Sequence, residues 1–114
     1  MNPWVSINAE IVAALEPILP TRHDVYSGPA KTYAMFMTYN RIPEINASGK
    51  SHATGVYGDI DVLSDKDISG KSSIIGTIIT ALEAAGFIVK DAQDIPFDGV
   101  SHHVLIPFYK LVPR

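Results

Sequence analysis

The chain has 114 residues, 46% of them hydrophobic and 18% charged, which is typical of a globular protein with one core and predicts a single domain over residues 1–114. Nine basic and twelve acidic residues give a net charge of −3, and the basic residues are scattered, so a general attraction to nucleic acid is excluded. The chain contains no cysteine, which excludes disulfides and zinc sites built from cysteine.

The first predicted element is an amphipathic helix. Apolar residues at spacings of i, i+4, i+7, i+8 and i+11 form one stripe, made of Ile7, Ile11, Ala14, Leu15 and Ile18. Pro17 cannot donate a hydrogen bond within a helix, and Pro20 stops any continuation. We therefore expect a helix over residues 6–18, followed by a short extended piece and a turn at Gly28-Pro29.

Two strands joined by a long loop are predicted next. Residues 32–40 are rich in β-forming residues and apolar on both faces, which favours a strand covered on both sides. Residues 54–64 alternate between an apolar face and a polar face, as in a strand with one buried side. The connection over 41–53 has no periodicity and exceeds the ~2–5 residues of an ordinary hairpin loop. We expect this loop to be mobile in the isolated protein and ordered on assembly.

A second helix and two more strands complete the pattern. The helix is expected over residues 71–85, from the apolar stripe Ile75, Ile78, Ile79, Leu82 and Ala85. Gly86 follows at the position where helices often end in a left-handed residue. A short strand over 87–89, a polar loop over 91–99 and a long strand over 101–112 come after it. Pro107 lacks an N–H, so it predicts an edge position or a bulge in the last strand.

The order α-β-β-α-β-β predicts an α+β fold: an antiparallel sheet of about four strands with two helices packed on one face. The expected core consists of residues on the apolar stripe or face of each element. They are Leu15, Ile18, Ile60, Val62, Ile78, Leu82, Val104 and Ile106.

No reaction chemistry is predicted. Asp59 and Asp61 share a strand face about 7 Å apart. Paired carboxylates can catalyse acid–base steps or bind a divalent cation, but a solvated strand face has the same spacing, and we favour an interface role. His102 and His103 are adjacent on a strand and point to opposite faces, so they cannot bind one metal. The sequence has no phosphate-binding loop and no nucleophile or zinc-protease motif, so we expect no catalytic, cofactor or metal site.

Three segments carry a family resemblance. They are Tyr-Gly-Asp-Ile-Asp-Val-Leu-Ser at 57–64, the helix over 73–85 that closes in Gly86-Phe87, and the strand His-His-Val-Leu-Ile-Pro at 102–107. Together with the N-terminal helix and the Tyr-rich strand, they resemble the tail-completion (tail-terminator, head-tail joining) proteins of long-tailed bacteriophages and prophages. The similarity covers most of the chain. The sequence Met-Phe-Met-Thr-Tyr at 35–39 departs from it, where more Val and Ile are expected.

The resemblance implies a non-enzymatic virion assembly protein that forms a ring, a hexamer in the assembled tail, at the head-proximal end of the tail tube. Implied partners are further copies of the chain, the tail-tube protein and the head-tail connector proteins, with DNA only as passing cargo. The implied location is the virion tail and, during assembly, the cytoplasm of the bacterial host. The residues that we expect at interfaces are Asp59, Asp61, Ile45, Asn46, Ser48, Gly49, Lys50 and His52.

Two other classes stay open. One is a different phage component of similar fold, either a head-completion or a tail-tube protein, and ring size would distinguish it. The other is a small cytosolic enzyme or ligand-binding α+β domain, which a deep pocket with convergent polar groups would favour. No signal peptide is expected from Met1–Trp4, and no apolar run approaches the ~20 residues of a membrane span.

Overall fold

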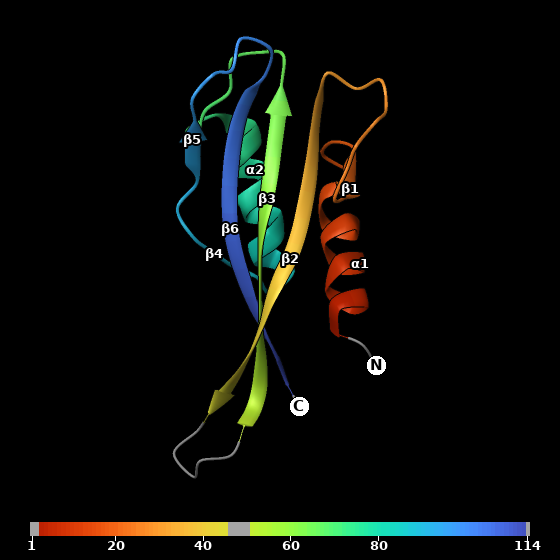
Figure 1. Ribbon diagram of the computed structural model, residues 1–114, viewed down its shortest axis with the longest axis vertical. Helices are drawn as coiled ribbons and strands as arrows, with labels where there is room; N and C mark the ends of the chain where they lie inside the picture. The colour runs from red at the N-terminus through yellow and green to blue at the C-terminus, as the bar shows by residue number, and fades with distance from the viewer. Residues whose placement is uncertain (1–2, 46–50, 114) are drawn as a thin grey trace.

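The computed structural model describes residues 3–45 and 51–113, which form two helices and six strands (Figure 1). The sheet order is β1-β2-β3-β6-β4, with β5 also paired to β6. β1 runs parallel to β2, and every other pair is antiparallel. Neither helix in this part of the chain is long and apolar enough to cross a membrane. In chain order the elements are α1 (Pro3–Leu15), β1 (Thr21–His23), β2 (Thr32–Ile45), β3 (Ser51–Ser64), α2 (Ser73–Ala84), β4 (Ile88–Val89), β5 (Gln93–Ile95) and β6 (His102–Pro113).

The α+β class is confirmed, but the predicted antiparallel sheet of about four strands is wrong, because the sheet is mixed and has six. The two unpredicted strands, β1 and β5, have three residues each, too few to show a period of two. They exist because a neighbouring strand offers hydrogen-bonding groups. The N–H of Ala34 donates to the carbonyl of Pro20, and the N–H of Asp24 donates to the carbonyl of Phe36.

Both helices pack on the same face of the sheet, as expected. The core residues of β2, β3 and β6 all lie on one face of the sheet, and the buried helix residues belong to the same cluster. In Figure 1, α2 lies behind β3 and β6, with the uncovered face toward the viewer. The core members are Ile7, Ile11, Leu15, Leu19, Ala34, Phe36, Val56, Ile60, Val62, Ile75, Ile78, Leu82, Phe87, Val104, Ile106 and Phe108.

The prediction that Ile18 belongs to the core is wrong. Ile18 is only partly buried, and Leu19 enters the core in its place with 4% exposure. The cause is the end of α1, which stops at Leu15 instead of residue 18 because Pro17 cannot continue the helical ladder. The chain then turns with the N–H groups of Ile18 and Leu19 both donating to the carbonyl of Leu15, which rotates Leu19 inward.

The end of α2 confirms the role predicted for Gly86. Its φ is +92°, a left-handed value that glycine adopts without strain. The N–H of Gly86 donates to the carbonyl of Glu83, and the N–H of Phe87 donates to the carbonyl of Leu82. This is a Schellman motif, and it carries the chain directly into β4 with Phe87 buried in the core.

The prediction of a loop over 41–53 is largely wrong, because β2 and β3 extend into this segment. Their paired ends, residues 41–45 and 51–56, form an antiparallel arm. Arg41 pairs with Val56 and Ile45 pairs with Ser51, so the strands run up to residues 46–50, which lie outside the described residues. The ladder propagates here because each added pair prolongs an existing hairpin. The arm projects beyond the helices in Figure 1, and the molecule measures 51 × 24 × 23 Å.

Pro107 lies where the partner strands of β6 change. β6 is paired with β3 along one side, and on its other side β4 and β5 pair with different parts of it. The carbonyl of Pro107 accepts the N–H of Lys90, but Pro107 has no N–H to return. β4 therefore ends at Val89, and β5 begins only at Gln93.

Candidate functional site

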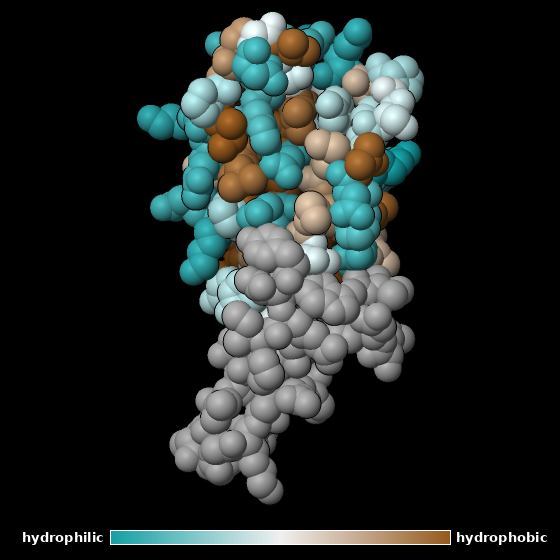
Figure 2. Space-filling model, viewed as in Figure 1, coloured by the Kyte–Doolittle hydropathy of each residue, from teal (hydrophilic) through white to brown (hydrophobic). Residues whose placement is uncertain are grey.

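One face of the sheet is not covered by helices. Alternation along β2, β3 and β6 places on it every residue that faces away from the core. Figure 2 looks onto this face and shows hydrophobic and hydrophilic side chains interspersed. Met37 is 50% exposed and Leu111 is 45% exposed. We call this surface the open sheet face; its described members are Tyr33, Met35, Met37, Tyr57, Asp59, Asp61, Leu63, His103, Leu105, Pro107, Tyr109 and Leu111.

Asp59 and Asp61 both lie on the open sheet face, half-buried among apolar neighbours. Oδ1 of Asp61 is 2.7 Å from Nε2 of His103, across β3 and β6. Asp59 is flanked in register by Met37 and Pro107. Neither Asp59 nor Asp61 lines the surface hollows that are described below. This arrangement can recognise a partner's charges.

The two adjacent histidines point to opposite faces, as predicted. His103 lies on the open sheet face, whereas the ring of His102 stacks on Phe97 with centroids 4.4 Å apart. Nδ1 of His102 is 3.7 Å from Oδ1 of Asp67. Over residues 3–45 and 51–113, no three His, Cys, Asp or Glu side chains are grouped to hold a metal ion.

The remaining interface predictions fall on the arm. Ile45 ends β2, and His52 lies near the start of β3. Asn46, Ser48, Gly49 and Lys50 lie outside the described residues, so their role stays a prediction.

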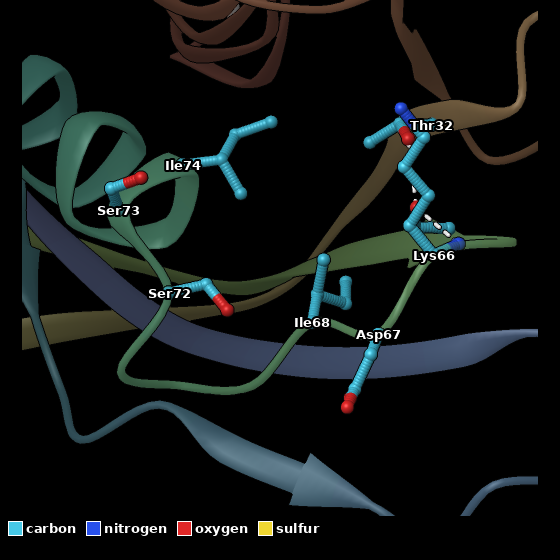
Figure 3. Close-up of a pocket in the computed structure, with 8 residues that line it drawn as sticks. Thr32, Lys66, Asp67, Ile68, Ser72, Ser73 and Ile74 are labelled. Atoms are coloured by element: carbon cyan, nitrogen blue, oxygen red, sulfur yellow. Dashed lines mark hydrogen bonds between the residues drawn. The ribbon is translucent and has the colours of Figure 1, made fainter.

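A hollow of about 480 Å³ lies between the end of β3 and the start of α2 (Figure 3). Ser72 and Ser73 form one side, Lys66 lies on the other, and Asp67 points away. Its inner polar groups are already paired: the hydroxyls of Thr32 and Ser64 share a 2.8 Å hydrogen bond. No buried side-chain nitrogen or oxygen among the described residues lacks a partner. The hollow therefore presents no buried unpaired side-chain polar group that calls for a ligand.

A second hollow, of about 630 Å³, runs between the outer sides of α1 and α2. We call it the helix groove. Its lining side chains are mostly small and none is charged. Three of them carry hydroxyl groups, namely Ser73, Thr77 and Thr80, and the others that matter below are Ala14, Ile18, Gly76 and Ala84. The groove continues toward Ala13 and Ala85, and Glu10 also lines that end. No local sequence pattern indicates the groove, because it needs two helices that are distant in the chain.

The segment before β6, predicted only as a polar loop, contains a tightly held turn. Oδ1 of Asp98 accepts the N–H groups of Val100 and Ser101, both at 2.8 Å, and Gly99 has a φ of +92°. These two hydrogen bonds, led by that of Ser101, hold the pKa of the Asp98 carboxyl below its usual value. The Phe-Asp-Gly string was the available signal, since Asp and Gly favour such turns.

The lowered pKa of Asp98 predicts that this turn loosens in acid. The unfolded chain binds the proton more readily than the folded one, so the stabilisation is present above the usual pKa of ~4 and is lost as pH falls through the lowered value. The amide NMR shifts of Val100 and Ser101 should therefore move at acidic pH. Asp98→Asn keeps the acceptor oxygen without the charge and should abolish that movement. A carboxyl of Asp98 that titrates at or above ~4 would contradict the assignment.

No family model and no curated protein matches the chain. Among solved structures, it matches a chain in the "Virion of native gene transfer agent (GTA) particle", with 15% identity over 98% of this chain and 90% of that chain. The TM-score is 0.44. Similarity at this level carries no argument about function, which must come from the surfaces of the molecule and from the sequence resemblance.

Proposed function

We propose that the chain is a non-enzymatic phage virion assembly protein that self-associates into a ring at the head-proximal end of a tail tube and joins the tail to the head connector. The observation that carries this proposal is the uncovered outer edge of the β2–β3 arm. The sequence resemblance supplies the specific role, and the open sheet face provides a second contact surface.

The edge of β2 is available for pairing over most of its length. β1 covers it only opposite Ala34–Phe36, and no described strand pairs with its outer side from residue 37 to residue 45. Unpaired backbone N–H and C=O groups on such an edge recruit another strand. If the added strand comes from a different edge of a second copy, the contact is heterologous and closes into a ring when the rotation allows.

The open sheet face supports the same proposal through its composition. Contiguous apolar patches on a protein surface mark interaction sites. Met35 and Met37 of β2 share this face with Leu105 and Pro107 of β6, and Met37 is about half exposed. Asp59 and Asp61 add negative charge, which selects among partners more than it strengthens binding. The net charge of −3 also suits a channel that lets DNA pass without holding it.

The proposal is tested by the native mass of the protein, measured alone and after mixing with phage tails that lack a terminator. A closed ring, in solution or on tails, is the expected result. An open tube would favour a tail-tube protein instead. A monomer under both conditions would contradict self-association, and turnover of a substrate would contradict the non-enzymatic assignment.

Reversing the charge of the open sheet face should change assembly without unfolding the monomer. Asp59→Lys with Asp61→Lys alters two half-buried positions outside the core, so the far-UV spectrum should be retained while the assembled fraction falls. Asp65→Lys with Asp67→Lys makes the same charge change on an exposed turn and should assemble like the wild type. Native mass spectrometry distinguishes the two. Equal assembly by both variants would show that Asp59 and Asp61 do not lie in the interface.

A further inference from the structure

Exposed hydrophobic side chains gather at the turn before β6. Among the described residues, seven large hydrophobic side chains are exposed, and Ile95, Phe97 and Val100 are three of them within six consecutive positions. Phe97 is 55% exposed and Val100 is 77% exposed. Single exposed hydrophobic residues are ordinary, but this local concentration is not. We call residues 97–100 the apolar turn.

The apolar turn is held in one conformation. Asp98 fixes the backbone through its hydrogen bonds to the N–H groups of Val100 and Ser101, and the ring of Phe97 stacks on His102 at an interplanar angle of 19°. Side chains that are already ordered lose little conformational entropy when they bind. The stacked ring of Phe97, with the exposed side chain of Val100 three residues further on, has the properties of an interface anchor.

The helix groove is complementary to this turn in size, polarity and charge. Its volume of about 630 Å³ accommodates a Phe and a Val side chain. The charged residue Glu10 lies only in the continuation of the groove, where its Oε1 is 2.6 Å from Nζ of Lys110. One end of the groove is Ser73, the first residue of α2. The first turn of α2 has no acidic residue, and the side chain of Ser72 makes no capping hydrogen bond. The positive end of the helix dipole there therefore favours a carboxylate, and the apolar turn carries Asp98 between its two hydrophobic residues.

We propose that the apolar turn of one copy binds in the helix groove of the next copy, with Phe97 and Val100 against the small residues of the groove and Asp98 toward the start of α2. The inference rests on the proposed ring and identifies one of its contacts. Turn and groove are different surfaces, so the contact is heterologous, as a ring requires. One Phe buries about 150–250 Å², well below the ~1,200–2,000 Å² of a stable interface. The contact therefore adds to pairing along the β2 edge.

Cross-linking tests the contact directly, because the chain has no cysteine of its own. A Val100→Cys copy is mixed with a Gly76→Cys copy under assembly conditions, and in parallel with a Thr80→Cys copy. A Cβ at Gly76 would meet no atom within 4 Å, so a side chain is accommodated there. A disulfide between unlike copies is expected in at least one mixture. Val25→Cys, at a residue 70% exposed in another loop, is the matched control and should not link to either groove position.

Filling the groove provides a second readout. Gly76→Leu should raise the concentration needed for half-assembly by about tenfold or more, while Gly76→Ala, which leaves most of the groove open, should change it far less. If the wild type assembles, yet no cross-link forms and Gly76→Leu assembles normally, this contact is wrong and the proposed ring stands. If the wild type stays monomeric both alone and with tails, both proposals are overturned.

Discussion

Replacing Leu82 with Ala should lower the free energy of unfolding by about 2–5 kcal/mol. Leu82 is fully buried on the face of α2 that contacts the sheet, so its truncation removes apolar contacts and leaves a cavity. The backbone carbonyl of Leu82 also accepts the N–H of Phe87 in the Schellman motif. Looser packing of Leu82 should therefore also weaken the C-terminal end of α2. Urea denaturation followed by circular dichroism measures the change.

Glu83→Ala is the matched control for the Leu82 variant. Glu83 is the next residue on the same helix and is exposed, so its truncation should change stability by less than about 0.5 kcal/mol. A loss below ~1 kcal/mol for Leu82→Ala would show that α2 presents a different face to the sheet than the structure assigns.

Replacing Gly58 with Val should cost about 3 kcal/mol, the upper end of the range for overpacked cores. Gly58 is buried in β3, opposite Thr38, where the register between β2 and β3 shifts. A Cβ there would collide with the backbone carbonyl oxygen of Met37 and lie 2.7 Å from Cζ of Phe108. The backbone cannot move aside without breaking the ladder, so the side chain has no space. The free energy of unfolding in urea is again the measurement.

Gly76→Ala serves as the control of opposite sign for Gly58→Val. Gly76 is exposed within α2 and nothing lies near a Cβ built on it, so alanine should stabilise the protein by about 0.5–1 kcal/mol through helix propensity. Similar effects of the two substitutions would contradict the packing around Gly58. A well-tolerated Val at position 58 would contradict the close approach of Met37 and Phe108 to this position.

The features that could be predicted from the sequence are those encoded over a few neighbouring residues. The apolar stripe of α2, the left-handed Gly86 after it and the alternation in β3 each follow from local geometry. These patterns predict an α+β fold with both helices on one face. The same alternation placed Asp59 and Asp61 together on the uncovered side of the sheet, because side chains two positions apart on a strand share a face.

Other features depend on partners that are distant in the chain. β1 and β5 have no periodicity of their own and form because β2 and β6 offer hydrogen-bonding edges. The continuation of β2 and β3 into an arm depends on the ladder between them, and local composition suggested a loop there. The hydrogen bond between Asp61 and His103 and the groove between α1 and α2 arise only once those elements are packed. The candidate interaction surfaces belong to this second group, since each combines residues from elements that the sequence keeps far apart.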